Sequence, residues 1–315
     1  MGATRSRLDA ARWHFQHGPM DLLLQAEGEP AVVAAAHEAA WLRFMPLLDE
    51  LVAELPALRR PVTARAALHG LVARSMWEAC AVHAPAFITP MAAVAGAVAQ
   101  ALIGCYDRPG IARAWVNNGG DIALHLAAGQ CARVGLYADL ARFDPADARS
   151  LRTDGQFGIA DTMPVRGVAT SGWRGRSFSL GIADSVTVLA ATAARADAAA
   201  TMIANAVDVP HPAIRRLPAC ECKDDSDLGE LPVTVEVPAL PRKVVRDALD
   251  AGAARARALQ EASHIHAAVL VCQGQWRVIQ PLCSALGGAQ ATAAASRGVD
   301  THRPGECTAV GSVFA

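Results

Sequence analysis

Residues 167–207 read GVATSGWRGRSFSLGIADSVTVLAATAARADAAATMIANAV and contain the strongest fold signals in the chain. The first part is rich in Ser, Gly and Arg, which is typical of a loop. Residues 185–190 (SVTVLA) are β-branched or apolar and predict a buried strand, whereas the Ala-rich residues 193–207 predict a helix. We therefore expect a polar loop, a strand and a helix in this order.

Asp197 and Thr201 form a candidate pair of metal ligands near the start of the predicted helix. Because they are four residues apart, their side chains are expected on one face of the helix, one turn apart. Carboxylate and hydroxyl oxygens are the hard ligands that Mg²⁺ prefers. The residues alone also allow a simpler interpretation, in which Asp197 favours the positive N-terminal end of the helix and Thr201 is an ordinary helix residue.

The composition describes a folded chain with balanced charge. Its 315 residues are 52% hydrophobic and 19% charged, and 29 Lys and Arg stand against 30 Asp and Glu. This length allows a substantial core in one domain or two, and the charge balance gives no electrostatic footprint for nucleic acid or an anionic membrane. With no signal-peptide core and no uninterrupted apolar run of about 18 residues, we expect a soluble cytoplasmic protein.

The eight cysteines are spread along the chain without a repeated Cys-x-x-Cys motif. Their spacing therefore predicts neither a disulfide framework nor a zinc site. Cys220 and Cys222 form the only close pair, within the charged residues 219–230. We interpret this segment as a solvated surface loop with two ordinary thiols.

The rest of the chain alternates between helix and strand patterns. Residues 12–26 have two apolar runs around His17-Gly18-Pro19, which indicates a hairpin or a tight bend. Helical periodicity is found over residues 29–58, 63–82 and 241–262. Strand-like patterns are found over residues 231–237 and 267–279.

Thr89 and Pro90 precede a helix made almost wholly of small residues, 91–104. Thr89 can cap this helix, and Pro is favoured at the first helical position. The uncovered N–H groups of the first turn could then receive a phosphate or another anion. A tightly packed buried helix explains the composition equally well.

The segment Asn117-Asn118-Gly119-Gly120-Asp121 lies between two strand-like runs. As a hairpin turn it needs no further explanation, because Asn, Gly and Asp are common turn residues. The two glycines also leave room for a bulky ligand to approach the backbone, with Asp121 at the edge of such a site. Local evidence does not decide between these interpretations.

Three blocks of this sequence together resemble a known family. They are ITPMAAVAGAVAQ (88–100), VNNGGDIAL (116–124) and GVATSGWRGRSFSLGIADSVTVLAATAARADAAAT (167–201). In this order they resemble the uncharacterised bacterial and archaeal proteins related to ApbE, the FAD:protein FMN transferase once assigned to thiamine biosynthesis. HFQHGPMDLLLQAEG and DDSDLGELPVTVEV look like further signatures of that group, so the resemblance covers roughly residues 10–280.

The resemblance implies a metal site beside a nucleotide site. In ApbE transferases a D-x-x-x-T pattern binds Mg²⁺, which here corresponds to Asp197 and Thr201, and a glycine-rich NxGGD-like segment lies near the bound flavin nucleotide. The nucleotide-contacting residues that we expect are Asn117, Gly119, Gly120, Asp121, Ser171, Gly172, Arg174 and Arg176. The two arginines suit phosphate oxygens because the guanidinium fork matches their geometry, although a solvated loop is an equally good interpretation.

Two departures from the ApbE pattern concern the chemistry itself. ApbE transferases carry a His-Ile-Ile-Asp-Pro-like segment before the SVTV strand, whereas this chain has GRSFSLGIADSVTV, without the histidine and without Asp-Pro. The Ala-Lys-Gly of the family's first block is Ala95-Gly96 here, without the lysine. The residue expected to carry the reaction is therefore missing.

The fold that the resemblance implies is α+β, with mixed or antiparallel sheets flanked by helices in two intertwined similar halves around a central cleft. We expect one domain over residues 1–285 and a loosely ordered Ala/Gly/Ser-rich tail over residues 286–315.

The function that the resemblance implies is Mg²⁺-assisted binding, transfer or hydrolysis of FAD, FMN or a related diphosphate nucleotide. A non-catalytic ligand-binding or assembly module is the main alternative, because the His and Lys are missing, and an enzyme with an unrelated small substrate is a third. We expect a small-molecule nucleotide or flavin as the partner, without nucleic acid or membrane, and a homodimer stays open.

Overall fold

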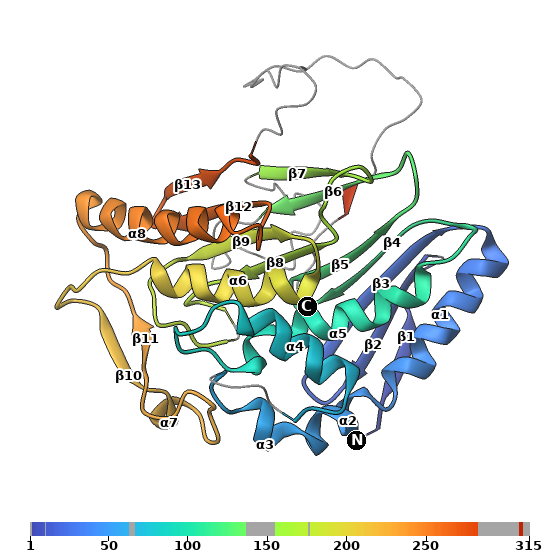
Figure 1. Cartoon of the computed structure of the whole chain (residues 1–315), viewed down its shortest axis with the longest axis horizontal. Helices are drawn as coiled ribbons and strands as arrows, with labels where there is room; N and C mark the ends of the chain where they lie inside the picture. The colour runs from blue at the N-terminus through green and yellow to red at the C-terminus, as the bar shows by residue number, and fades with distance from the viewer. Residues whose placement is uncertain are drawn as a thin grey trace, which may run out of the picture.

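A nine-stranded antiparallel sheet organises the fold (Figure 1). The computed structural model describes residues 2–9, 11–62, 67–136, 155–175, 177–282 and 309–310. The strands of this sheet, from one edge to the other, are β1 (Thr4–Arg7), β2 (Arg12–His17), β3 (Met20–Gly28), β4 (Ile111–Asn118), β5 (Asp121–Leu126), β8 (Gly167–Ser171), β9 (Ser185–Ala190), β12 (Ala267–Cys272) and β13 (Gln275–Ile279).

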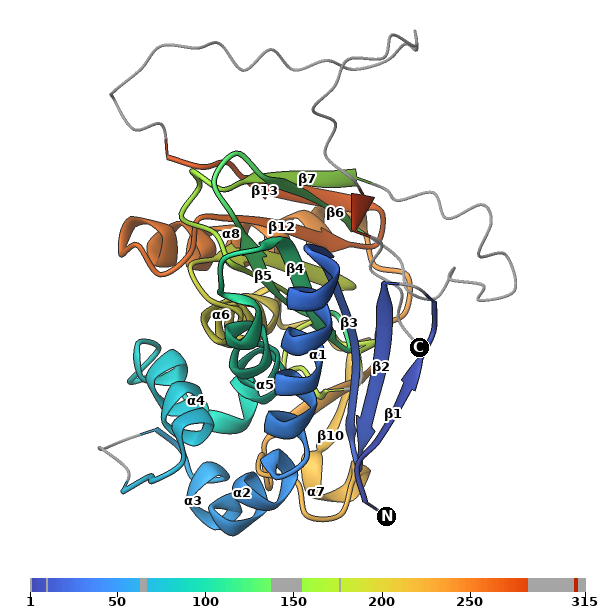
Figure 2. The ribbon, with the colours of Figure 1, turned by 90° about the vertical axis from the view of Figure 1, so that its right-hand side faces the viewer.

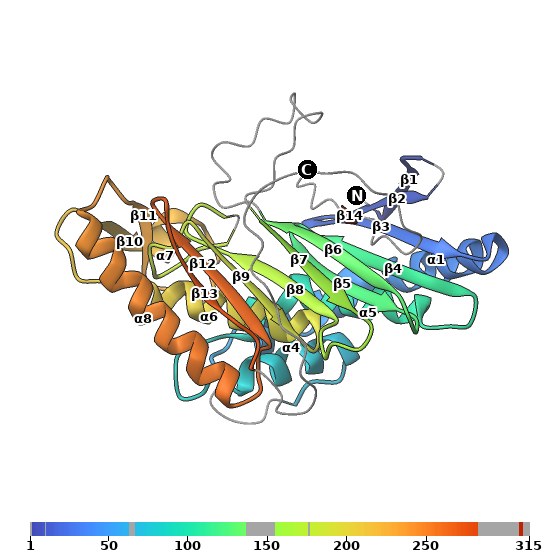
Figure 3. The same cartoon turned by 90° about the horizontal axis from the view of Figure 1, so that it is seen from above.

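Helices cover one face of this sheet, as Figures 2 and 3 show. The helices and 3₁₀ turns of the described residues are α1 (Pro30–Phe44), α2 (Leu47–Ala53), α3 (Leu55–Leu58), α4 (Leu71–Ala81), η1 (Pro90–Ala93), α5 (Val94–Ile103), η2 (Gly104–Tyr106), α6 (Ala193–Ala206), α7 (Ala219–Cys222) and α8 (Arg242–Glu261), of which α7 lies beside the ribbon of β10 (Arg215–Pro218) and β11 (Pro232–Glu236). Two clusters of buried apolar side chains lie between sheet and helices, one under α1, α4 and α5 and one under α6 and α8.

Two smaller sheets complete the architecture. β6 (Cys131–Leu136) pairs with β7 (Gly155–Ala160) and, in parallel, with β14 (Ala309–Val310). Side chains of β6 and β7 pack with residues of β4, β5 and β8 that alternate with those facing the helices, so this sheet lies on the opposite face of the main sheet. β10 (Arg215–Pro218) and β11 (Pro232–Glu236) form a separate two-stranded ribbon.

The described chain is thus α+β with a mostly antiparallel sheet flanked by helices, as predicted. In the stretch of residues 167–207, the predicted strand is confirmed as β9 and the predicted helix as α6. The prediction of a loop before them is wrong for β8, where Gly167–Ser171 pairs with β9 and is buried over its first three residues. Flanking strands on both sides satisfy its backbone, which outweighs its loop-like composition.

Most other predicted elements are confirmed with shifted ends. β2 and β3 form the predicted N-terminal hairpin, and the helical residues 29–58 are divided among α1, α2 and α3, with a break at Pro46. The helix predicted over residues 63–82 begins only at Leu71, while residues 63–66 lie outside the described residues. The strand-like residues 267–279 are a hairpin, because Gln273 and Gly274 both have positive φ.

The termini and cysteines add two observations. Of the tail predicted to be loosely ordered, residues 286–315, only residues 309–310 lie within the described residues. Cys220 and Cys222 are free and exposed, as expected for ordinary thiols, whereas Cys131 is disulfide-bonded, which the cysteine spacing did not predict.

The helical segment Pro30–Ala53 is long and apolar enough to cross a membrane by length and composition alone. In the structure, Ala36, Ala40 and Phe44 of this segment are buried in the core beside β3. A core helix meets the same length and composition criteria, so the segment is weak evidence for a membrane span.

A cap at the N-terminus of α6 gives a first testable prediction. The hydroxyl of Thr192 accepts a hydrogen bond from the N–H of Arg195 at 3.3 Å. Thr192→Ala should lower the free energy of unfolding by about 1 kcal/mol, because that N–H loses its partner. Urea denaturation measures this loss, and Thr192→Ser should restore most of the stability since the accepting oxygen is kept.

Candidate ligand pocket

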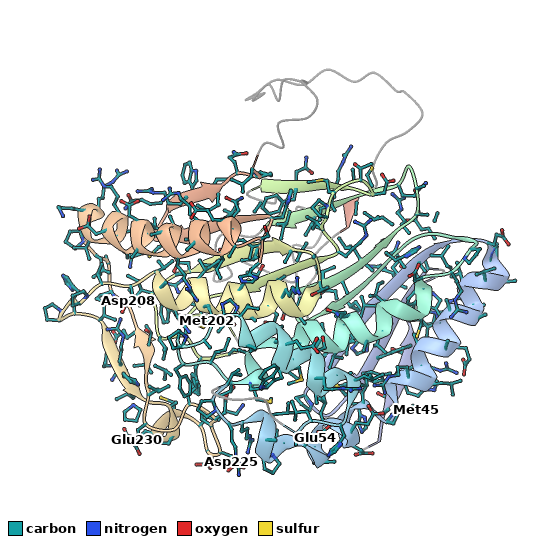
Figure 4. All side chains as sticks on the ribbon, viewed as in Figure 1. Met45, Glu54, Met202, Asp208, Asp225 and Glu230 are labelled. Atoms are coloured by element: carbon teal, nitrogen blue, oxygen red, sulfur yellow. The ribbon has the colours of Figure 1, made fainter. Side chains whose placement is uncertain are left out.

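A pocket of about 830 Å³ lies beside α5 and α6, which contribute residues to its wall. Its wall contains residues of η1 and α5, of the β4–β5 turn, of the segment after β8, of α6 and of the segment after α7. Figure 4 marks Met202 on α6 and Asp225 after α7, both of which line it. Segments far apart in the sequence therefore meet at one cavity.

Asp197 and Thr201 both lie in the pocket wall, one turn apart on α6. The N–H of Gly96 on α5 donates a hydrogen bond to Oδ2 of Asp197 at 2.9 Å. Burial raises the pKa of Asp197 from its ordinary 3.8 to about 7, against the lowering effect of the N–H groups of Gly96 and Ala95. The carboxylate is therefore costly to ionise in the absence of a cation.

Gly96 explains why Asp197 sits so close to α5. A Cβ at position 96 would lie 2.3 Å from the carbonyl oxygen of Ala193 and 2.9 Å from the Cβ of Asp197. Only glycine therefore allows α5 and α6 to approach this closely. The small residues of α5 therefore agree with the prediction of a tightly packed buried helix.

Within the segment Asn117 to Asp121, the two-residue hairpin turn between β4 and β5 consists of Gly119 and Gly120, and Asn118 pairs with Asp121 on either side of it. Gly119 and Gly120 have φ of 65° and 110°, which favour glycine. Gly119 and Asp121 line the pocket. The buried Asn117 accepts a hydrogen bond from Gly120 N–H at 2.8 Å and so supports the turn. The turn interpretation and the site interpretation are therefore compatible.

The segment after β8 contributes Ser171, Gly172 and Arg174 to the pocket wall. Arg174 is exposed, and its Nε lies 3.8 Å from Oδ1 of Asp184, which also lines the pocket. Arg176, the other predicted arginine, lies outside the described residues. Of the ten predicted site residues, the structure thus brings Gly119, Asp121, Ser171, Gly172, Arg174, Asp197 and Thr201 to one pocket wall, with Asn117 and Gly120 directly behind it.

Thr89 lies in the pocket wall and has a different role from the predicted cap. It precedes η1 but makes no capping hydrogen bond, and its hydroxyl instead donates to Oδ2 of Asp227. Asp227 belongs to the charged residues 219–230, predicted as a solvated surface loop; Lys223, Asp224 and Asp225 are exposed as predicted, but residues 223–228 also line the pocket, which the prediction did not include. The DDSDLGELPVTVEV block was the sequence signal for this wall.

Acidic side chains outnumber basic ones among the described residues of the pocket wall. The carboxylates belong to Asp121, Asp184, Asp197, Asp224, Asp225 and Asp227, and the cationic side chains belong to Arg59, Arg174 and Lys223. No group of three or more His, Cys, Asp or Glu side chains that could hold a metal ion occurs within the described part of the chain. A cation bound at Asp197 would therefore take other ligands from hydroxyl groups, water or a bound molecule.

The fold and pocket define an α+β protein with a pocket lined by α5, α6, the β4–β5 turn and the segments after β8 and α7. A family model described as AbpE bacteria matches residues 4–278, so the chain belongs to that family. A UPF0280 protein of Methanopyrus kandleri is 36% identical over 225 residues, which are 68% of this chain and 83% of the relative.

Further relatives carry the same name and agree in identity. A UPF0280 protein of Methanosphaerula palustris is 34% identical over 62% of this chain and 77% of the relative. A UPF0280 protein of Methanospirillum hungatei is 38% identical over 39% of this chain and 46% of the relative. The family is uncharacterised, and these names assign no activity.

Proposed function

We propose that the pocket binds a flavin or a related diphosphate nucleotide together with Mg²⁺. The observation that supports this proposal is that Asp197, Thr201 and the Gly119 turn line one pocket although they come from distant segments. Arg174 at the same pocket supplies a guanidinium that can bind phosphate oxygens. The excess of carboxylates in the described wall favours a nucleotide that arrives with a cation over a bare polyanion.

The donor atoms fit Mg²⁺ better than a softer metal. Asp197 and Thr201 offer one carboxylate and one hydroxyl, both hard oxygen ligands, without histidine or cysteine. Mg²⁺ usually binds to one or two protein side chains and completes its shell with water and substrate phosphates. When bound here, Mg²⁺ would screen the charge of a diphosphate and polarise its phosphoryl oxygens.

The size and the apolar lining of the pocket also suit a flavin nucleotide. Ligand pockets in proteins usually measure about 300–1,000 Å³ and are mostly apolar with a few polar groups. This pocket of about 830 Å³ is lined by seven large apolar side chains in addition to its polar groups, namely Phe87, Ile88, Met91, Phe178, Leu180, Met202 and Leu228. An extended ligand with a planar ring can therefore bury its apolar part here.

A non-catalytic binding module is the second candidate function. No histidine lies among the described lining residues, so the usual proton-transfer group near neutral pH is missing from this part of the wall. A protein of this kind would bind the nucleotide without turning it over.

Two measurements separate these functions. Titration calorimetry of the purified full chain with FAD, in buffer with Mg²⁺ or with a chelator, should give Mg²⁺-dependent binding. The proposal is rejected if millimolar FAD does not bind in the presence of Mg²⁺. Chromatography of the same mixtures then detects AMP, whose release from FAD indicates an enzyme and whose absence despite binding indicates a module.

Thr201→Val should weaken Mg²⁺-dependent FAD binding about tenfold, the change expected for one lost polar contact. Valine keeps the shape of threonine but cannot coordinate a metal ion, so the fold should be retained. Thr201→Ser keeps the hydroxyl and should bind like the wild type in the same calorimetric titration. Unchanged affinity in Thr201→Val would remove Thr201 from the proposed set of ligands.

We also propose a finer relationship to the ApbE transferases, with two intertwined similar halves in one domain over residues 1–285. The block order and the D-x-x-x-T pattern support this relationship. A cytoplasmic location and a homodimer complete the proposal, and size-exclusion chromatography with light scattering tests the dimer.

A further inference from the structure

One wall of the pocket is a short acidic segment that is attached to the rest of the protein mainly at its base. Residues 223–228 (KDDSDL), here called the acidic strap, all line the pocket. The two ends of the segment are held together, since the N–H groups of Ala219 and Cys220 donate to the carbonyl oxygens of Leu231 and Gly229 at 3.0 and 2.9 Å. The strap is therefore a closed loop projecting from α7 and the β10–β11 ribbon.

The base of the strap is anchored firmly through the β10–β11 ribbon. The N–H of Thr234 on β11 donates to the carbonyl oxygen of Ser179 at 2.8 Å, and Thr234 is buried. Arg216 on β10 forms an ion pair with Asp208, which follows α6. Ala219, the first residue of α7, is completely buried. Movement of the base would therefore break buried contacts.

The tip of the strap is held differently. Within the described residues, two polar contacts join it to the opposite wall of the pocket, the hydrogen bond from Thr89 to Asp227 and an ion pair of Arg59 with Asp225 at 3.3 Å. Exposed ion pairs contribute little to stability, and the Asp225 side chain is 86% exposed. The contact between Thr89 and Asp227 is therefore the main polar latch at the tip.

We propose that the acidic strap is a movable wall, which closes over the pocket through the latch between Thr89 and Asp227 and opens to admit the ligand. None of the six strap residues is buried, and a segment without buried side chains opens locally at a small cost in free energy, whereas its anchored base stays in place. Thr89 itself is 2% exposed, so its hydroxyl is positioned by the core and the moving partner is Asp227. The strap thus controls access to the ligand site.

A ligand-free experiment tests this inference without relying on the proposed function. Met202 lines the pocket and is 8% exposed, so a cysteine in its place should react slowly with a bulky maleimide while the strap is closed. In Met202→Cys, the added Thr89→Val substitution should accelerate labelling of residue 202 about tenfold, because it removes the latch hydrogen bond. Mass spectrometry of the residue-202 peptide follows this reaction separately from the native cysteines.

Two matched controls accompany this experiment. Thr89→Ser keeps the hydroxyl and should label at the slow rate. Asp224→Ala removes the same side chain from the strap as Asp227→Ala, but no contact of Asp224 with the opposite wall is found within the described residues, so only Asp227→Ala should accelerate labelling. Equal labelling rates with and without the latch, at equal thermal stability, would overturn the inference.

A second arm uses the proposed ligand and therefore rests on the proposed function. In stopped-flow mixing with FAD and Mg²⁺, the observed binding rate should reach a plateau set by opening of the strap, and Thr89→Val should raise this plateau about tenfold. If FAD does not bind, the proposed function fails while the labelling experiment still decides on the strap. If FAD binds and the plateau is the same in both proteins, the strap does not control entry.

Discussion

Gly96→Ala should lower the free energy of unfolding by about 3 kcal/mol or more, at or beyond the upper end for overpacked cores. The added methyl group would lie 2.3 Å from the carbonyl oxygen of Ala193, which is backbone and cannot rotate away. Helices α5 and α6 must therefore separate. Because the N–H of Gly96 also donates to Asp197, this separation displaces the carboxylate, and Mg²⁺-dependent ligand binding should be lost with the stability.

Gly104, which follows α5, is the matched control for this substitution. Its φ of −57° is ordinary for any residue, and a Cβ there would have nothing within 4 Å. Gly104→Ala should therefore leave stability unchanged or raise it by up to about 1 kcal/mol, since alanine restricts the unfolded chain. Urea denaturation of both variants measures the difference. A Gly96→Ala protein as stable as Gly104→Ala would contradict the close helix contact.

The sequence predicts those parts of the fold that depend on local pattern. Residues 185–190 predict β9 and residues 193–207 predict α6 because apolar and Ala-rich runs of those lengths have one favoured conformation. The local pattern does not predict β8, because its glycine and serine are typical turn residues and it becomes a strand only by pairing with β5 and β9. The order of the nine strands depends on contacts between distant segments, which a periodic pattern does not contain.

The candidate site was predictable where a motif carries its own geometry. The spacing of Asp197 and Thr201 on a helix places both side chains on one face, and the structure has both in the pocket wall. Arg59 and Asp227 were not predicted as site residues, because charged side chains such as theirs are typical of a solvated surface. They reach the pocket only through the path of the chain after α3 and α7, which no local property of either residue indicates.

Asp197→Asn should abolish Mg²⁺-dependent FAD binding, with a loss of at least about 100-fold, because even residues that merely support metal ligands cost about 10–100-fold when removed. The same substitution should make the ligand-free protein more stable at pH 8. Asparagine keeps the shape of the side chain and an oxygen that can accept from Gly96 N–H, but it carries no charge to be buried. A gain in stability coupled to a loss of binding is expected for a charge kept for function.

The raised pKa of Asp197 determines how the free energy of unfolding changes with pH. The pKa of Asp197 is raised from 3.8 to about 7 on folding, so the folded protein binds this proton more tightly than the unfolded chain does. The stability contributed by the protonated carboxyl is complete below about pH 4 and is lost as the pH rises through about 7. Thermal unfolding without Mg²⁺ should therefore show that Asp197→Asn removes this decline and gains up to about 4 kcal/mol at pH 8.

Asp224→Asn is the control for this charge change, because Asp224 is exposed and its removal should leave the pH dependence as in the wild type. Added Mg²⁺ with FAD should stabilise the wild type at pH 8 but not Asp197→Asn, since a ligand stabilises only a fold that binds it. If Asp197→Asn shows the wild-type decline between pH 4 and pH 8, the buried carboxylate is not its source. If the variant is also stabilised by Mg²⁺ and FAD, the metal is held elsewhere.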